Sequence, residues 1–280
     1  MRFSLKNSFS FSVVIPTLNN RRKYLNEAIN SIEKQTLLPY EVIIVNNGKN
    51  NLEITKSSLN IRHVKIAFKS GVSKARNFGV SLAKSNYIAF LDDDDFWGIN
   101  YLENMKTAIK KSKPDCLIGR LDQHVNNKIK PFKNAQGNIT KDIILIRNPG
   151  ITGSSIVIKK NIFQEIGGFN TKLPAGEDKS LILELIEKKF KIIAVPNSQA
   201  IIRQSDTERL SNSQNMYYGI SQFYKVYNDQ MNLSHKINNL YKINKYLWSF
   251  KKSISGALLY NFFFILVTLD RIIKKFFKLK

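Results

Sequence analysis

The sequence has only one cysteine, Cys116, among 280 residues. A lone thiol cannot close an internal disulfide, and it has no second cysteine with which to build a thiolate metal site. The N-terminal segment also lacks the apolar run of about 7 to 15 residues that an export signal carries. We therefore expect a protein that stays in the reducing cytoplasm.

Acidic residues are scarce as well, with 21 Asp and Glu against 44 Lys and Arg, for a formal net charge of +23. This balance favours an anionic neighbour, which could be a nucleic acid, a membrane surface or a phosphorylated small molecule. No recognised nucleic-acid-binding module is present. The first predicted strand is followed by PTLNNR, without the Gly-x-Gly-x-x-Gly fingerprint of a dinucleotide-dependent oxidoreductase.

What the sequence does contain is an alternation of strand and helix patterns. The β-branched runs at 11–16 and 41–48 predict strands, and the apolar spacing between them, at Leu25, Ala28, Ile29 and Ile32, predicts a helix. The alternation continues along the chain. Further strands are predicted at 63–68, 87–91, 115–121, 154–160 and 191–196, and further helices at 71–85, 100–112, 161–169 and 176–190.

This order of elements predicts an α/β fold, in which a mainly parallel, Rossmann-like sheet is covered by helices on both faces. From about residue 205 the pattern becomes helical. We therefore predict two parts, a main region at 1–204 and a helical C-terminal region at 205–280. The aromatic-rich segment 216–227 has helical spacing, which favours packing of the C-terminal helices onto the main region.

Four consecutive aspartates, Asp92–Asp95, follow the apolar run 87–91. Two ionised carboxylates about 5 Å apart repel by roughly 3 kcal/mol at an effective dielectric constant near 20, so the run requires solvent, shifted pKa values or a cation. Ligands of such sheets bind beyond the carboxyl ends of the strands. Carboxylates there suit Mg²⁺ or Mn²⁺, with substrate phosphates completing the metal's ligand shell.

One other interpretation of the run remains open, and a second one fails. The aspartates could form a polar turn that caps the helix beginning near Ile99. Asp92, Asp94 and Glu103 also match three positions of a calcium-binding loop, but Phe96 and Trp97 occupy its fifth ligand position and its glycine position. The three histidines, His63, His124 and His235, are unclustered and predict no metal site.

Six motifs together resemble glycosyltransferase family 2, whose members have the A-type nucleotide-sugar-binding fold. They are VVIPTLNN, VIIVNNG, GVSKARNFG, FLDDDDFW, IGGF and GED, and the resemblance covers residues 11 to about 196. The resemblance implies inverting transfer of a sugar from a nucleoside-diphosphate donor to an acceptor hydroxyl with Mn²⁺ or Mg²⁺. No Gln-x-x-Arg-Trp stretch follows, so we expect a non-processive enzyme.

The resemblance also implies residue roles. In the Asp-x-Asp element, Asp94 and Asp92 are the expected metal ligands, and Asp92 and Asp93 are expected near the nucleotide. In the Glu-Asp pair, Asp178 is the expected catalytic base, with Glu177 beside it. Helix N-terminal charge complementarity is the alternative role for this pair.

The remaining expected nucleotide-binding residues are Pro16, Thr17, Asn19, Asn46 and Arg76, although Arg76 could equally be a structural ion-pair partner. Where this chain has Asn46 and Asn47, the family often has an aspartate that accepts a hydrogen bond from the uracil N–H. An Asn carbonyl can accept the same hydrogen bond. We therefore take uridine as the default nucleoside. We also expect Gly153, Ser154 and Ser155 to let a substrate approach, with a simple turn as the alternative.

The C-terminal segment combines a 16-residue apolar run at 254–269 with flanking lysines and arginines. A helix of this length spans about 24 Å, short of a hydrocarbon core of about 30 Å. We therefore expect a helix that lies on an anionic membrane, placing the enzyme peripherally on the inner face of the cell membrane. An ordinary packed helix is the alternative.

Taken together, these features predict a glycosyltransferase, of the hexosyl- or N-acetylhexosaminyltransferase class, in bacterial surface polysaccharide or lipopolysaccharide biosynthesis. Its expected partners are a nucleoside-diphosphate sugar, a glycan or lipid-linked acceptor and an anionic membrane, with no nucleic acid. A non-catalytic nucleotide-sugar-binding protein and a basic nucleic-acid- or membrane-binding module remain the alternatives.

Overall fold

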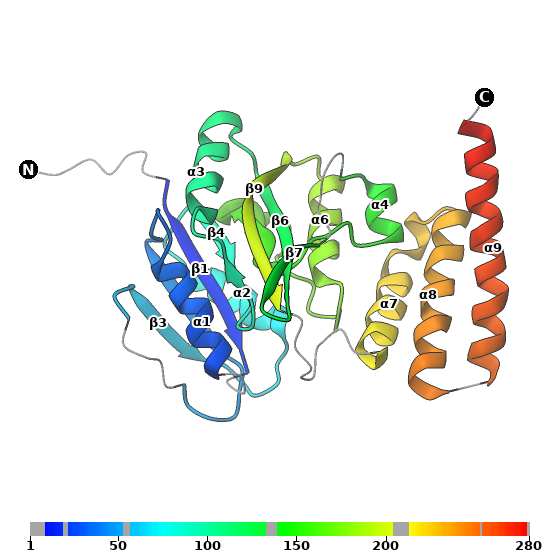
Figure 1. Ribbon diagram of the computed structural model, residues 1–280, viewed down its shortest axis with the longest axis horizontal. Coiled ribbons are helices and arrows are strands. Elements are labelled where there is room, and N and C mark those ends of the chain that lie inside the picture. The colour runs from blue at the N-terminus through cyan, green and yellow to red at the C-terminus, as the bar shows by residue number, and fades with distance from the viewer. Residues whose placement is uncertain are drawn as a thin grey trace, which may run out of the picture.

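The computed structural model describes residues 9–18, 22–52, 57–132, 139–203, 213–252 and 254–278. In this part of the chain the strands form one sheet, and a row of helices extends from one side of it (Figure 1). The elements in chain order are β1 (Phe11–Thr17), α1 (Arg22–Glu33), β2 (Glu41–Asn46), β3 (Ile61–Lys65), α2 (Val72–Leu82), β4 (Tyr87–Phe90), β5 (Phe96–Trp97), α3 (Tyr101–Ser112), β6 (Cys116–Val125), β7 (Lys128–Pro131), α4 (Lys141–Ile146), β8 (Ile156–Lys159), α5 (Lys160–Glu165), α6 (Glu177–Glu187), β9 (Ile192–Arg203), α7 (Ser213–Tyr227), α8 (Leu233–Lys251) and α9 (Ile254–Lys278).

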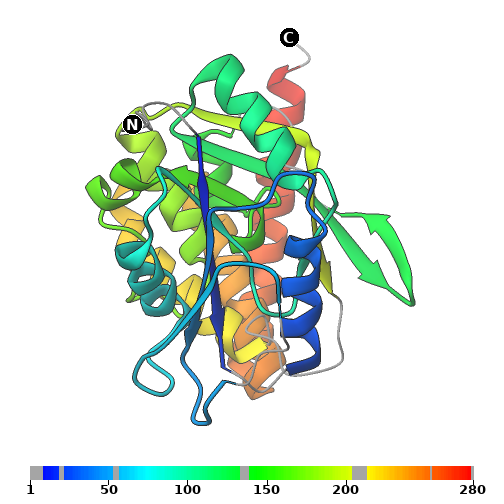
Figure 2. The ribbon, with the colours of Figure 1, turned by 90° about the vertical axis from the view of Figure 1, so that its left-hand side faces the viewer.

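The sheet has the strand order β3-β2-β1-β4-β8-β6-β9-β5, with β7 paired to β6. The pairs β1–β2, β1–β4, β2–β3 and β6–β9 are parallel, whereas β4–β8, β6–β8, β6–β7 and β5–β9 are antiparallel. The α/β class is as predicted, but the sheet is mixed rather than mainly parallel. The reason is that β8 enters between β4 and β6 and runs antiparallel to both. The β6–β7 hairpin projects from the body of the molecule (Figure 2).

Alternating side chains of the central strands separate two hydrophobic cores. On one face, Val13 and Ile15 of β1 pack with buried residues of α1 and α3. On the other face, Val14 packs with buried residues of α2, α4, α5 and α6. Helix α2 approaches this face so closely that a Cβ atom on Gly79 would collide with Val14. The arrangement is three layered, because each strand presents apolar residues to both faces.

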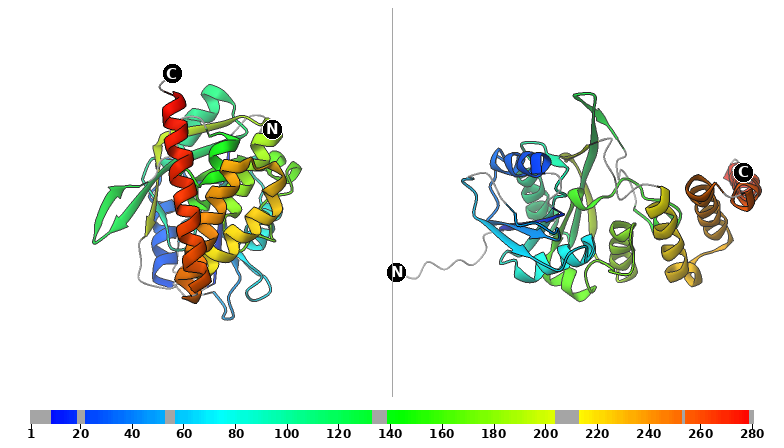
Figure 3. Two further views of the ribbon diagram at one scale, coloured as in Figure 1. Left: turned by 90° about the vertical axis from the view of Figure 1, so that its right-hand side faces the viewer. Right: turned by 90° about the horizontal axis from the view of Figure 1, so that it is seen from below.

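The C-terminal helices are stacked side by side, with α7 nearest the sheet and α9 outermost (Figure 3). Phe223 and Tyr227 of α7 belong to the same hydrophobic core as α6, which confirms that the aromatic segment packs these helices onto the main region. β9 ends at Arg203 and α7 begins at Ser213. The predicted boundary near 204 lies outside the described residues and stays a prediction.

Helix α9 is longer than the apolar run suggested. It has 25 residues, and its segment Ile254–Lys275 is long and apolar enough to cross a membrane by length and composition. Its 22 residues would extend about 33 Å, so the predicted shortfall against the hydrocarbon core does not hold. One side of the helix packs along α8, while large apolar residues such as Ile254, Leu258 and Ile265 are more than half exposed.

Candidate active site

A cavity of about 990 Å³ opens at the carboxyl ends of β1 and β4. In the strand order β2-β1-β4, the chain leaves β1 toward β2 on one side and later returns to pair β4 on the other. Connections that diverge in this way leave a crevice at the strand ends. The cavity continues from this crevice to helices α7 and α8.

We divide the cavity into two halves that meet at Glu177 and Asp178. The sheet half is lined mainly by residues that follow strands: Pro16, Thr17, Asn47, Lys69, Arg76, Asp92–Asp95 and Arg203. The helix half is lined by residues of the loop after α4 and of α6, α7 and α8: Arg147, Asn148, Lys179, Asn215, Met216, Gly219, Tyr241, Lys242, Lys245 and Tyr246.

The four aspartates lie in different environments. Thr17 Oγ1 donates to Asp93 at 2.5 Å, which joins the ends of β1 and β4. Asp95 is only 6% exposed and accepts hydrogen bonds from Ser154 Oγ at 2.6 Å and from the Arg203 amide at 3.3 Å. Burial raises the pKa of Asp95 well above its ordinary value, and nearby Asp94 and Asp92 raise it further. The run is therefore divided between a buried anchor, Asp95, and three carboxylates at the cavity.

Arg76 lies at the centre of the site, although it is only 2% exposed. Its guanidinium donates to Asp92 at 2.6 Å and to Glu177 at 2.9 Å, and it lies 3.5 Å from Asp178. Burial alone would lower the pKa of Arg76, but the three carboxylates outweigh that effect and raise it. The structural ion-pair role left open for Arg76 is therefore present, and it ties the acidic run to the Glu-Asp pair.

Because Gly153 has no side chain, the Arg76 guanidinium fits beside it. A Cβ atom at this position would lie 2.7 Å from the guanidinium carbon. Ser154 accepts a hydrogen bond from the Asp92 amide at 3.0 Å and donates to Asp95, and its backbone carbonyl accepts from the Trp97 indole at 2.8 Å. The expectation that residues 153–155 leave room for a substrate is wrong, because they are buried and hold the acidic run in place.

Glu177 and Asp178 begin helix α6, after Gly176 in the left-handed conformation with φ of 84°. The two carboxylates differ in their contacts. Both line the cavity, but Glu177 lies 2.9 Å from Arg76 with its side chain 9% exposed, whereas Asp178 lies 3.5 Å from Arg76 with its side chain 15% exposed. Burial raises the pKa of Asp178 well above its ordinary value, and Glu177 raises it further while Arg76 opposes the shift. A carboxylate with raised proton affinity, facing a cavity, is suited to accept a proton.

The residues expected to bind the nucleotide are only partly brought together. Pro16 and Thr17 line the sheet half, but the Asn46 amide is engaged in its own loop, with Asn50 and Gly48. The neighbouring Asn47 lines the cavity instead, and its Oδ1 accepts from the Ser70 amide at 2.8 Å. Asn19 lies outside the described residues.

Comparison with known proteins identifies the family. The family model "Glycosyl transferase family 2" matches residues 12–167, which is more than half of the chain. The chain belongs to glycosyltransferase family 2. A solved structure of TarS from S. aureus, residues 1–349 in complex with UDP-GlcNAc, superposes with a TM-score of 0.62 over 90% of this chain and 78% of that chain, at 19% identity. The likeness confirms the A-type glycosyltransferase fold.

Two relatives with curated names are similar to this chain in sequence. TarP from Staphylococcus aureus (strain N315), a poly(ribitol-phosphate) beta-N-acetylglucosaminyltransferase, is 34% identical over 145 residues, covering 48% of this chain and 43% of TarP. GgaB from Bacillus subtilis (strain 168), a minor teichoic acid biosynthesis protein, is 31% identical over 203 residues, covering 66% of this chain and 22% of GgaB. The chain spans less than two thirds of the length of the curated relatives it matches.

The metal expected in a family 2 enzyme can be tested against the donor set. Among the described residues, no group of three or more His, Cys, Asp or Glu side chains is arranged to hold a metal ion. Asp92 and Asp94 nevertheless both line the sheet half. Two carboxylates suit Mg²⁺ or Mn²⁺ when phosphate oxygens supply further ligands. The residues therefore fit a metal that is shared with a diphosphate, and do not form a complete protein cage.

Sequence reasoning missed three residues of the site. Arg203 stacks on Phe96, with its guanidinium carbon 4.6 Å from the ring centroid, and pairs with Glu27. It lies at the end of β9, which extends seven residues beyond the predicted strand. Ser154 was expected beside a substrate or in a turn, and not as a hydrogen-bond partner of Asp92 and Asp95. Lys179 follows the Glu-Asp pair directly, but its burial follows from packing against α7 and has no local signal.

Proposed function

We propose that the protein is an inverting, metal-dependent, non-processive glycosyltransferase. It transfers one sugar from a nucleoside-diphosphate sugar, with uridine as the default base, to a hydroxyl of a glycan or lipid-linked acceptor in bacterial surface polysaccharide or lipopolysaccharide biosynthesis. The observation that carries the proposal is that Arg76 holds Asp92, one of the two candidate metal ligands, and Asp178, the candidate base, at two nitrogens of one guanidinium.

The proposed reaction uses the two halves of the cavity for two substrates. The donor diphosphate binds in the sheet half, next to Asp92 and Asp94. A bound Mg²⁺ or Mn²⁺ would neutralise the negative charge that develops on the leaving diphosphate. Asp178 takes the proton from the acceptor hydroxyl as its oxygen bonds to the anomeric carbon and the bond from that carbon to the phosphate oxygen breaks. Attack from the face opposite the leaving group inverts the anomeric configuration.

The relatives support the donor and acceptor classes. TarP is named for transfer of N-acetylglucosamine to a poly(ribitol-phosphate), and TarS was solved with UDP-GlcNAc. These points favour a UDP-sugar donor of the hexosyl or N-acetylhexosaminyl type, and favour transferase activity over non-catalytic nucleotide-sugar binding.

Donor screening tests this proposal. Nucleotide sugars should be screened with and without Mn²⁺ for thermal stabilisation and for release of the nucleoside diphosphate. We expect metal-dependent stabilisation by one donor class and, with a suitable acceptor, a product of inverted configuration by NMR. A product of retained configuration, or turnover that is unaffected by chelation, would contradict the mechanism.

The second part of the proposal is peripheral attachment to the inner face of the cell membrane through α9. Support comes from the way α9 packs: Tyr260 stacks on Tyr241 and Trp248 of α8, and Asp270 accepts from Ser234 at 2.8 Å. A transmembrane α9 would carry α8, with its lysines, into the hydrocarbon, where charged groups are expensive. A helix lying in the headgroup layer, with its exposed apolar face inserted and its flanking lysines near anionic lipids, avoids that cost.

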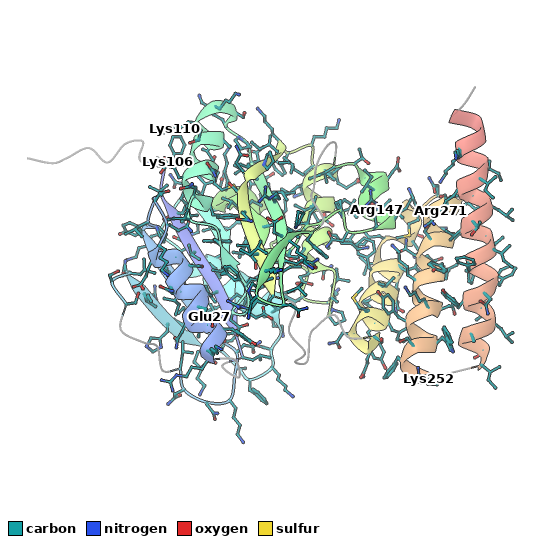
Figure 4. The ribbon with its side chains drawn as sticks, viewed as in Figure 1. Glu27, Lys106, Lys110, Arg147, Lys252 and Arg271 are labelled. Atoms are coloured by element: carbon teal, nitrogen blue, oxygen red, sulfur yellow. The ribbon has the colours of Figure 1, made fainter. Side chains whose placement is uncertain are left out.

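Vesicle flotation tests the attachment. Leu258→Glu with Ile265→Glu, both on the exposed face of α9, should abolish binding to anionic vesicles. Lys106→Ala with Lys110→Ala on α3, which lies far from α9 (Figure 4), lowers the net charge by the same two units and should leave binding nearly unchanged. Equal losses in both double variants would point to unspecific charge attraction and contradict an apolar membrane contact.

A further inference from the structure

The helix half of the cavity is strongly cationic. Four of its lining side chains are Arg147, Lys179, Lys242 and Lys245, and the acidic side chains of the lining are Glu177 and Asp178, at the junction with the sheet half, and Asp92–Asp95, in the sheet half. The four cations come from three segments that are distant in the sequence, namely the loop after α4, helix α6 and helix α8. Their convergence on one cavity is therefore a product of the fold and not of a charge run in the sequence.

The innermost cation, Lys179, has no anionic partner. It is 8% exposed, and its ammonium lies 3.4 Å from the centroid of the Phe223 ring. Among the residues that the structure describes, it makes no hydrogen bond or ion pair. Burial lowers its pKa to about 7, and nearby Lys242 contributes to the shift. A buried, unpaired ammonium is unfavourable unless an anion joins it.

The other three cations extend from Lys179 toward solvent. Lys242 is half-buried and donates to the Ile146 carbonyl, which holds α8 against the end of α4. Arg147, the next residue after that carbonyl, is exposed and lies between the sheet region and the C-terminal helices (Figure 4). Lys245, about one turn after Lys242 on α8, is also exposed. Cations that become progressively more exposed form a path suited to an extended anionic ligand.

The position of this path relative to Asp178 identifies the ligand. The donor diphosphate is assigned to the sheet half, where carboxylates require a metal ion to approach it. A ligand in the helix half reaches Asp178 from the other side, which is where the acceptor hydroxyl must be. We propose that the helix half binds a phosphate group of the acceptor, so that the acceptor is a phosphate-bearing glycan or polyol; this inference rests on the proposed function.

Phosphate could come from a soluble phosphodiester-linked oligomer or from a lipid-linked diphosphate. The probes are therefore a short glycerol phosphate oligomer, an uncharged ether-linked oligoglycerol of matched length, and a polyprenyl diphosphate in otherwise neutral vesicles. Binding is measured with the full chain, saturated with UDP and Mn²⁺ so that the sheet half is filled. We expect one phosphate probe to bind and the uncharged oligoglycerol not to bind. Whichever phosphate probe binds identifies the source.

Matched variants test the location. Arg147→Gln with Lys245→Gln removes two exposed cations from the helix half and should weaken binding of the phosphate probe about 10- to 100-fold. Lys225→Gln with Lys251→Gln removes two exposed cations of α7 and α8 that do not line the cavity, and should change binding less than twofold. Equal weakening by both pairs, or competition between the probe and UDP, would overturn the proposal.

Lys179→Met supplies an independent readout. Removing the unpaired ammonium from beneath Phe223 should raise the melting temperature of the free protein while weakening binding of the phosphate probe. A variant that binds the probe as tightly as the parent would contradict the assignment. If the parent protein fails to bind UDP with Mn²⁺, the proposed function is wrong; if UDP binds and donor turnover persists but no phosphate probe binds, only this inference is wrong.

Discussion

The two halves of the cavity are lined by side chains of opposite charge. Among the described residues that line the sheet half, the four carboxylates of Asp92–Asp95 face the cations of Lys69, Arg76 and Arg203, and Arg76 lies directly against Asp92. In the helix half, Arg147, Lys179, Lys242 and Lys245 exceed the carboxylates. The comparison suggests that one half is completed by a cation and the other by an anion. Asp178 lies where the two halves meet. There it would accept the proton of the acceptor hydroxyl while the sugar is transferred to the oxygen of that hydroxyl.

The largest expected effect is at this border. Asp178→Asn keeps the shape of the side chain but removes the proton acceptor, so transfer should fall about 10²- to 10⁴-fold. Binding of UDP with Mn²⁺, measured by calorimetry, should stay within twofold. The control Asp229→Asn, at an exposed position after α7, should leave both unchanged. Normal transfer by Asp178→Asn would show that another group is the base.

Substitutions of Asp94 and Asp95 in the sheet half should have smaller effects, and the two effects should differ. Asp94→Asn should lower kcat about 10²- to 10³-fold, the loss expected when a stabiliser of developing charge is weakened, and should weaken the Mn²⁺ dependence of UDP binding. Asp95→Asn disturbs the hydrogen bonds to Ser154 and Arg203 and should lower the free energy of unfolding by roughly 1–3 kcal/mol. Weakened Mn²⁺ dependence in Asp95→Asn but not in Asp94→Asn would reverse these assignments.

Gly153→Ala addresses the link between the halves. The added methyl group must displace the Arg76 guanidinium, so the free energy of unfolding, measured by urea denaturation, should fall by roughly 1–3 kcal/mol. Transfer should fall as well, because Asp92, Glu177 and Asp178 lose their common partner. A stable variant with normal transfer would mean that Arg76 does not need its observed position.

The smallest expected effect is a shift of the pH profile. Asp178 acts as a base only when deprotonated, and its pKa is raised by burial and by Glu177. Transfer should therefore rise with pH through a midpoint above the ordinary aspartate value. Glu177→Gln removes one cause of the shift and should move the midpoint of the kcat/KM profile to lower pH. An unchanged midpoint would exclude Asp178 as the titrating group.

Several features of the site were predictable because they depend on neighbouring residues. The apolar run of β4 places Asp92–Asp95 at a strand end, and the apolar periodicity of α6 places Glu177 and Asp178 at its first turn. The choice between Asn46 and Asn47 was not predictable. It depends on the path of the loop after β2, which turns the first amide toward its own backbone and the second toward the cavity.

Longer-range features were also outside the reach of the sequence. The short elements β5, β7 and α4 have two, four and six residues, too few to show a clear period. The mixed direction of the sheet depends on where β8 inserts, and the partners of Arg76 in α6 are 101 and 102 residues away along the chain. Such contacts are set by packing, because nothing in the residues around position 76 specifies its partners.

The sequence by itself determined the order of strands and helices, the family, and the positions of the carboxylates along the chain, because periodicity and motif spacing are local properties. The tertiary structure alone decided that one buried guanidinium joins the acidic run to the Glu-Asp pair, that Asp95 is an anchor, and that four cations from three segments meet in one cavity. These arrangements result from the balance of desolvation and charge pairing, which exists only after distant segments have packed together.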